Sequence, residues 1–464
     1  MAGGGALCCG LAAQAAAPIP RPPRPAPPPP APPPGAAPYT PALWPAAADF
    51  APRARQSLRA PRDPSRPFLV YAIGSSFTNG LGLGRVAFEQ LRAACPGAPP
   101  LVWRQTVGNA TPWQYLRGWL EGDVIPANPD LVLIYTVGMM HHLDDILAQL
   151  RKRTTAEVVV PTVHWRANDA SHWGQREDAP DQDVAALRAT CAKHGAFVLE
   201  HRAELARYMR ENNLPIDALL RDKFHQSRYG THILQLLFAA ALAAPTSGAV
   251  DPRVEIHALN RSLTPGAPLA LTVRGGRFDL GLDAGAGRLR VQIDDQPAPA
   301  HRAAVLGPVR FSPANAAIPG ATPRETGPHG VRPGPAGLHG PDQWTLTVLD
   351  PPTRYLFEAA GAGPQGEGLI AEDSASADGQ LLVPARWWRY PERSRPGDTY
   401  QISVQRGVVD EVSAALDPQA ARHLGGYVEH RLAVGLSPGA HRLVLQAEGA
   451  PVHLRQLYAH TVQA

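Results

Sequence analysis

The sequence predicts an α/β domain with a three-layer parallel sheet, followed by an all-β, sandwich-like domain. Short apolar runs alternate with helical patterns along residues 65–246, and after Pro245 the apolar residues repeat with a period of two. The alternation indicates parallel strands covered by helices, whereas the two-residue period is typical of antiparallel strands with one buried face. A chain of 464 residues is also long enough for two domains.

Five short apolar runs predict the strands of the parallel sheet. The clearest are residues 68–73 and 131–135, whose bulky apolar side chains suit a strand buried on both faces. The five strands are expected at residues 68–73, 101–106, 131–135, 157–163 and 197–199. Helical spacing of apolar residues predicts helices at residues 85–95, 113–120, 142–151, 183–193, 203–211 and 231–243.

Alternating polar and apolar residues predict the β-sandwich over residues 250–464. Residues 288–293, 344–348 and 441–445 show the pattern most clearly. Residues 312–343 are rich in Pro, Gly and His and are expected to form a long loop between strands. The string from Gly435 to Gly439 matches G-x-S-x-G, but Pro438 and a strand follow its serine, so we expect a hairpin turn there.

The N-terminal region differs from both domains in composition. Residues 1–17 are small and apolar and resemble a shortened signal peptide, with a cleavage site at Ala13–Ala15. We therefore expect a secreted or periplasmic protein, or a cytoplasmic one if this segment is not a signal. Residues 18–64 are rich in Pro and Ala and are expected to form a disordered linker. No apolar run is long enough to predict a transmembrane segment.

Charge and cysteine content exclude several classes of function. The net charge is +4, and the arginines are scattered without a basic stripe, so we expect no nucleic-acid partner. Cys95 and Cys191 each fall in a predicted helix, and their spacing does not suggest a metal site. Because these helices are expected on opposite faces of the sheet, we predict two free, buried thiols.

Two segments supply the side chains of an acyl-transferring hydrolase. Ser76 lies in the turn after the first predicted strand, where ligands approach a parallel sheet. Asp222 and His225 are three residues apart just before the last predicted helix, so that one turn can hold the carboxylate beside the imidazole. A hydroxyl, a base and a group that orients the base are the parts of a catalytic triad.

These segments resemble the SGNH (GDSL-type) hydrolase superfamily over about residues 66–244. The family's Gly-Asp-Ser-x-Thr block is matched by Gly74–Thr78, with Ser75 in place of Asp, and its Asp-x-x-His block by Asp222 and His225. The resemblance implies a flavodoxin-like three-layer fold. It also implies that Ser76 is the nucleophile, that His225 is the base and that Asp222 orients it.

The resemblance also implies an oxyanion hole, which this sequence matches only in part. The N–H groups of Ser76 and Gly108 would be two of the donors. The family's third donor is an Asn side chain in a Gly-x-Asn block, where this chain has Met140, which cannot donate. Three alternatives stay open: a neighbouring group such as Asn109 or His141 substitutes, two backbone donors suffice, or the domain is a degenerate relative that is weakly active or only binds its ligand.

Three loop side chains are expected at the same edge of the sheet and are predicted to bind substrate: His141, Trp165 and Trp173. Tryptophans can stack on a sugar or an aryl group. Adjacent histidines such as His141 and His142 point in different directions, so we expect no metal site, and no motif predicts a cofactor.

The C-terminal half resembles the jelly-roll accessory domains of carbohydrate esterases. The stretches that carry this resemblance are residues 275–282, 288–294 and 436–443. Together, the two resemblances imply a serine esterase that removes acyl groups, such as acetyl, from a small-molecule or polysaccharide ester, and the N-terminal segment leads us to expect that it is exported. The alternatives are a polysaccharide O-acyltransferase, which would use the same residues, and a degenerate glycan-binding protein.

Overall fold

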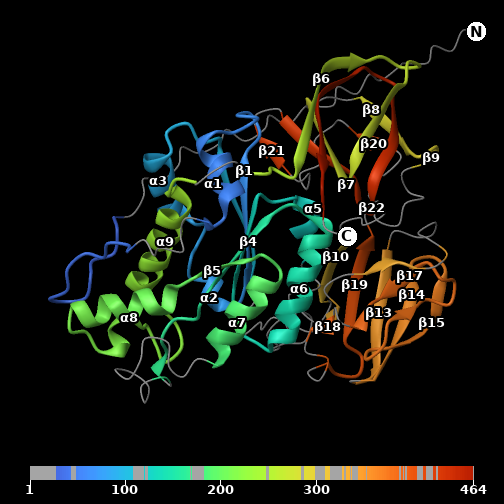
Figure 1. The fold of residues 1–464 in the computed structure, drawn as a ribbon. Helices are drawn as coiled ribbons and strands as arrows, with labels where there is room; N and C mark the ends of the chain where they lie inside the picture. The colour runs from blue at the N-terminus through green and yellow to red at the C-terminus, as the bar shows by residue number, and fades with distance from the viewer. Residues whose placement is uncertain are drawn as a thin grey trace, which may run out of the picture.

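The computed structural model describes residues 28–42, 49–107, 120, 124–167, 169, 182–246, 250–283, 287–297, 309–313, 327–328, 331–334, 336, 343–351, 353–385, 388–389, 391, 394–404, 411–413, 422–424 and 427–462. The predicted fold class, an α/β domain followed by antiparallel β-structure, is confirmed (Figure 1). Within the described parts of the chain, no helix combines the length and the apolar character needed to cross a bilayer.

A five-stranded parallel sheet forms the centre of the α/β domain, in the order β2-β1-β3-β4-β5. Each predicted strand is present, and its ends differ from the prediction by at most two residues. The strands are β1 (Phe68–Gly74), β2 (Leu101–Val107), β3 (Leu131–Tyr135), β4 (Glu157–Pro161) and β5 (Phe197–Leu199). The order reverses between β1 and β3, and ligands bind such sheets beyond the carboxyl ends of the strands at this point.

Helices cover both faces of this sheet and create two apolar cores (Figure 1). Along β1, Val70 faces the first core while Leu69 and Tyr71 face the second, which explains the continuous apolar run. The first face is covered by α1 (Pro52–Arg59), α3 (Arg85–Ala94) and α9 (Arg228–Ala243). The second is covered by α6 (Met140–Arg153) and α7 (Gln182–Lys193). A further helix, α8 (His201–Glu211), packs against α9.

The predicted helices and thiols agree with these layers. Five of the six predicted helices are present, and the sixth, at residues 113–120, lies outside the described residues except for Leu120. Cys95 belongs to the first core and Cys191 to the second, and both thiols are free and buried, as predicted.

The first β-unit is one sheet that folds around its own core. Its strands are β6 (Val254–Leu263), β7 (Leu269–Asp283), β8 (Arg288–Ile293), β9 (Gln296–Pro297), β20 (Glu411–Ser413), β21 (Arg422–Leu424), β22 (Tyr427–Glu448) and β23 (Val452–His460). The long strands β7 and β22 pair on both sides of an irregularity between Val434 and Gly439. Leu280 from one side and Leu443 from the other meet in one core.

The hairpin turn predicted at Gly435–Gly439 is therefore wrong. This segment is an irregularity inside β22, and the strand continues beyond it. Opposite it, Gly275 and Gly276 lie where an added Cβ would come within 3.0 Å of other atoms. Glycines in both strands allow the close approach and the bend at this place.

A second β-unit, inserted between β9 and β20, corrects the prediction of a single sandwich over residues 250–464. Its main sheet has the order β10-β19-β13-β14-β15 and encloses a separate core that contains Trp344, Phe357 and Tyr400. Its strands are β10 (Val309–Pro313), β13 (Gln343–Asp350), β14 (Arg354–Ala359), β15 (Gly363–Leu369) and β19 (Thr399–Val404). Two smaller sheets use β11 (Gly327–Pro328), β12 (Arg332–Pro333), β16 (Ser374–Ala375), β17 (Leu381–Val383) and β18 (Trp388–Arg389). The loop predicted at residues 312–343 thus includes two short strands.

Part of the predicted linker is folded against the α/β domain. Helix α1 buries Leu58, and Tyr39 is 6% exposed. The N–H of Tyr39 donates to Tyr229 Oη at 2.7 Å, and its hydroxyl donates to Glu204 at 2.9 Å. The prediction of a disordered linker over residues 18–64 is therefore wrong for residues 36–42 and 52–59.

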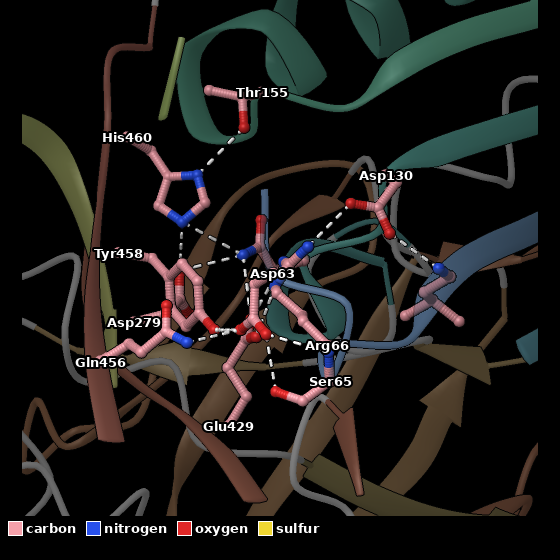
Figure 2. Close-up of polar contacts among 12 residues, drawn as sticks. Asp63, Ser65, Arg66, Asp130, Thr155, Asp279, Glu429, Gln456, Tyr458 and His460 are labelled. Carbon is pink, nitrogen blue, oxygen red and sulfur yellow. Dashed lines mark hydrogen bonds and ion pairs between the residues drawn. The ribbon is translucent and has the colours of Figure 1, made fainter. Parts of the chain in front are cut away.

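Polar side chains join the first β-unit to the amino edge of the parallel sheet (Figure 2). Arg66, just before β1, donates to Glu429 of β22 at 2.8 Å and to Asp130 at 2.8 Å. Tyr458 of β23 donates to Asp63 at 2.6 Å. Both β-units lie beside the α/β domain, one above the other at the right of Figure 1.

Candidate active site

The turn after β1 presents Ser76 at the carboxyl edge of the sheet. Ser76 is the first residue of the short helix α2 (Ser76–Asn79), and Ser75 Oγ accepts a hydrogen bond from the N–H of Phe77 at 3.4 Å. The hydroxyl of Thr78, which is fully buried, donates to the carbonyl of Tyr135 at the end of β3 at 2.6 Å. This bond fixes the turn against the point where the strand order reverses.

A second turn, between the 3₁₀ helix η4 (Ile216–Leu219) and α9, carries Asp222 and His225. The Asp222 carboxylate accepts the backbone N–H groups of Phe224 and His225 at 2.9 and 2.8 Å. A carboxylate that accepts two N–H groups of its own turn fixes the turn locally. These bonds, Phe224 N–H foremost and then His225, hold the pKa of Asp222 well below its usual range.

The two turns bring Ser76, His225 and Asp222 into one hydrogen-bonded chain. Ser76 Oγ lies 2.9 Å from His225 Nε2, and His225 Nδ1 lies 2.9 Å from both carboxylate oxygens of Asp222. Because a carboxylate only accepts, Nδ1 carries the proton and Nε2 is free to accept from the Ser76 hydroxyl. The side chains of Asp222 and His225 are 45% and 30% exposed, so this chain is open to solvent.

The other predicted oxyanion and substrate-binding residues either lie outside the described residues or belong to other parts of the fold. Gly108, Asn109 and Trp173 lie outside the described residues. His141 lies in the first turn of α6, with its ring centroid 3.9 Å from that of His142. Met140 begins the same helix and packs against the second core.

Trp165 is buried, which corrects its assignment as a substrate-binding residue. Its side chain is 1% exposed, its Nε1–H donates to the carbonyl of Arg202 at 3.0 Å, and the Arg202 guanidinium stacks 3.7 Å from its ring centroid. A sugar cannot reach either face of such a ring. Trp165 is part of the core beneath this edge of the sheet.

Several buried polar residues next to the triad were missed at the level of sequence. Tyr135, His164 and His201 are all 1% exposed or less, and the Tyr135 hydroxyl lies 2.7 Å from His164 Nδ1. Burial lowers the pKa of His164 to about 4 and lowers that of His201 as well, so both imidazoles are neutral near pH 7. The available signal was weak, since single histidines after predicted strands form no motif.

The described residues form no metal site, and the hollow at the amino edge of the sheet lies away from the triad. No group of His, Cys, Asp and Glu side chains in the described part of the chain is arranged to hold a metal ion. A hollow lined by Arg53, Asp63 and Tyr458 lies at the amino edge of the sheet, opposite Ser76. It therefore lies apart from the triad.

Comparisons with known proteins find matches among solved structures alone. No family model matches the chain, and no curated protein matches its sequence. Among solved structures, the chain is similar to the acetylxylan esterase Axe2 from Geobacillus stearothermophilus, with a TM-score of 0.32 and 16% identity over 38% of this chain and 94% of that one. It is also similar to a two-domain esterase active on acetylated mannans, with a TM-score of 0.31 and 10% identity over 89% and 94% of the two chains. The functional assignment therefore rests on the geometry of the triad.

Proposed function

We propose that the protein is a serine ester hydrolase in which Ser76 is the nucleophile, His225 the general base and Asp222 the residue that orients the base. The observation that carries this proposal is the chain of 2.9 Å contacts from Ser76 Oγ through the two ring nitrogens of His225 to Asp222. Ser76 lies 146 residues before Asp222 in the chain, and the three side chains from these two segments meet in the order that nucleophilic catalysis requires.

The reaction follows from this order. Ser76 Oγ attacks the ester carbonyl carbon while its proton passes to His225 Nε2, and Asp222 stabilises the imidazolium that forms. The tetrahedral intermediate collapses as Nε2 returns the proton to the leaving alcohol, which leaves the acyl group on Ser76. Water then attacks the acyl-enzyme with His225 again as base, and the carboxylic acid and free Ser76 result.

The oxyanion donors belong to the proposal. The N–H groups of Ser76 and Gly108 would stabilise the oxyanion, with Asn109 as a further donor. Met140 begins α6 where the resembling family has an Asn donor, and a thioether cannot replace an amide. Removal of one such donor from an enzyme typically costs about 100- to 1000-fold in rate. Slow turnover would therefore be consistent with this site.

We propose an acylated carbohydrate, such as an acetylated polysaccharide, as the substrate of an exported enzyme. The motif resemblances of both halves of the sequence support this choice. The exposure of Asp222 and His225 also supports it, because an open site at the edge of a sheet admits a bulky alcohol component. The small, apolar residues 1–17, which resemble a shortened signal peptide, support the export part of this proposal.

Covalent labelling of Ser76 tests the proposal. A fluorophosphonate probe should label the wild-type protein at Ser76, and hydrolysis of p-nitrophenyl acetate should be lost in Ser76→Ala. Ser75→Ala is the matched control, because this neighbouring hydroxyl accepts from Phe77 N–H and makes no contact with His225 in the described structure. Labelling that persists in Ser76→Ala would remove Ser76 from the mechanism.

Substrate assays then separate the alternatives. Acetate released from acetylated xylan or mannan supports the hydrolase. Transfer of the acetyl group to an added glycan in preference to water would indicate the acyltransferase. Glycan binding without any labelling or turnover would indicate the degenerate binding protein.

A further inference from the structure

The turn that carries the catalytic base is closed on itself but lies at the surface. Within it, Arg221 N–H donates to the His225 carbonyl at 2.8 Å, and Ser227 N–H donates to the Leu219 carbonyl at 2.8 Å. Phe224, at its tip, is 47% exposed. Such internal bonds fix the shape of the turn, but they do not fix its distance from Ser76, which belongs to another segment.

The segment after β4 supplies bonds from outside the turn. His164 Nε2 lies 2.8 Å from the carbonyl oxygen of Phe224, the residue before His225. The N–H of Ala167 donates to the carbonyl of Lys223 at 3.0 Å. Two consecutive carbonyls of the turn are thus bound by a segment anchored in the parallel sheet.

The protonation of His164 is fixed by its two partners. A carbonyl only accepts, so Nε2 must carry the proton that is donated to Phe224. Nδ1 then accepts from the Tyr135 hydroxyl at 2.7 Å, and Tyr135 is the last residue of β3. The side-chain amide of Gln226 donates to the same hydroxyl oxygen at 3.1 Å. The end of β3 is therefore linked to both residues that flank His225.

His164 also packs against the segment of the nucleophile. The ring of Phe77, the residue after Ser76, lies edge to face with His164 at 4.8 Å between centroids and with His225 at 5.8 Å. The imidazole of His164 thus contacts the nucleophile turn through Phe77 and the base turn through Phe224.

We propose that His164 is a positioning residue that sets the distance between Ser76 and His225 by holding the base turn against β3 and β4. This role rests on the proposed function. The residue touches neither the substrate nor the reacting atoms, and it acts through the Phe224 carbonyl and the Phe77 ring.

Steady-state kinetics of three variants test the role. His164→Ala should lower kcat for p-nitrophenyl acetate about 10- to 100-fold with KM within about twofold, because small misplacements of a catalytic group cost up to about 100-fold. His164→Gln should recover most of the loss, since its amide N–H can donate to Phe224. The active sites are counted by labelling Ser76 with a fluorophosphonate to completion, and each rate is divided by this count. A smaller fraction of folded protein then does not lower the measured kcat.

Trp165→Phe is the matched control for buried hydrogen bonds in the same segment. It removes one bond to a backbone carbonyl from an equally buried neighbour, but that bond points to Arg202 and not to the base turn. We expect a lower melting temperature and an unchanged kcat per active site. A melting temperature lowered in both variants with kcat unchanged in both would overturn the positioning role of His164.

The outcomes for His164 and for the proposed function can be told apart. Ser76-dependent turnover in the wild type with a normal rate in His164→Ala would contradict the role of His164 alone. A wild-type protein without Ser76-dependent turnover or labelling would contradict the hydrolase and this role together. A kcat for His164→Gln as low as that for His164→Ala would also contradict the role, because an amide N–H that can donate to the Phe224 carbonyl would then not restore catalysis.

Discussion

Gly74 controls the sharp turn that exposes Ser76. Its φ is +154°, and a Cβ built on it would lie 2.2 Å from Thr78 Oγ1 and 2.3 Å from the Tyr135 carbonyl oxygen. Both contacts are far shorter than any real Cβ contact, and one is with backbone, which cannot move away easily. The position therefore requires glycine for both its backbone angle and its space.

Gly74→Ala should therefore displace α2 and break the bond between Thr78 and Tyr135. We expect a loss of esterase activity of about 100-fold or more and a decrease of about 1–3 kcal/mol in the free energy of unfolding. Gly82→Ala is the control, because its φ is also positive, at +57°, while its Cβ would meet no atom within 4 Å. Similar losses in both variants would show that backbone strain alone, and not the clash, matters.

Burial of neutral His164 makes the stability depend on pH. Well above pH 6.5 the imidazole is neutral in both the folded and the unfolded chain, so its contribution is constant. Between pH 6.5 and about 4 the unfolded chain takes up a proton that the folded protein does not. The free energy of unfolding therefore falls as the pH falls, by up to about 3 kcal/mol for this group.

Urea unfolding at about pH 7 and pH 4.5 checks this expectation. The wild type should lose more stability between the two conditions than His164→Gln, whose side chain does not titrate. The nearby charges of Arg166, Arg202 and Asp169 are present in both proteins and cancel in this comparison. Equal losses in the two proteins would contradict the buried neutral state of His164.

Among the secondary-structure elements, those buried on both faces could be predicted best. The strands at Leu131–Tyr135 and Phe68–Gly74 leave continuous apolar runs, because helices cover each face of the sheet. The long strand β22 could not be predicted, because Ser437–Pro438–Gly439 has the composition of a turn. Its continuation depends on Gly275 and Gly276 in β7, which are about 160 residues away.

In the candidate site too, residues that belong to short motifs could be predicted, whereas a residue whose partners are distant in the chain could not. The meeting of Ser76 with Asp222 and His225 could be predicted, because each segment stands beside a predicted strand or helix that leads to the same edge of the sheet. His164 could not, because its role depends on the approach of Phe224, 60 residues later in the chain. The inserted β-unit was missed for a related reason, since its strands alternate like those that flank it.

A buried carboxylate contributes to holding the N-terminal segment at residues 36–42 against α8. Glu204 of α8 is fully buried and accepts the Tyr39 hydroxyl and the Ala42 N–H, each at 2.9 Å. Arg207 forms an ion pair with it. The Tyr39 ring also packs edge to face with Tyr208 at 5.7 Å between centroids, and the Tyr39 N–H donates to Tyr229, so Glu204 is the main charged partner of the segment but not its sole support.

Glu204→Ala should therefore loosen this segment. We expect exchange of the Ala42 amide hydrogen to become about 10- to 100-fold faster, because a charge-assisted hydrogen bond contributes about 1.5–3 kcal/mol. Glu211→Ala is the control, since this carboxylate also pairs with Arg207 but is 55% exposed and has no described bond to the segment. Equal acceleration in both variants would assign the effect to Arg207 instead.

At the scale of the whole molecule, charged groups buried between the two halves join them into one unit. The charged groups of Arg277 and Asp279 of β7 are both fully buried and form a bidentate pair at 2.7 and 3.0 Å. Arg277 also donates to the carbonyl of Ile125 in the α/β domain at 2.6 Å. Asp279 accepts from Asn128 at 3.1 Å and lies 3.0 Å from His460 Nε2 (Figure 2).

The Arg277 guanidinium keeps the buried Asp279 carboxyl ionised. Burial alone would raise the pKa of Asp279, but the Arg277 guanidinium and then His460 hold it well below its usual range. Without Arg277 the carboxylate would be buried with too little compensating charge, and the Ile125 carbonyl would lose its donor. Removal of one partner from a buried ion pair typically costs about 3–5 kcal/mol.

Arg277→Ala should accordingly lower the free energy of unfolding by about 3–5 kcal/mol, measured by urea denaturation near pH 7. Arg274→Ala, an exposed arginine of the same strand, should change it by no more than about 0.5 kcal/mol. Because Arg277 lies at the amino edge of the sheet and Ser76 at the carboxyl edge, kcat per active site should stay unchanged at a temperature where both variants are folded. Equal stability of the two variants would show that the buried pair does not hold the halves together, and an altered kcat would show that the junction affects the triad.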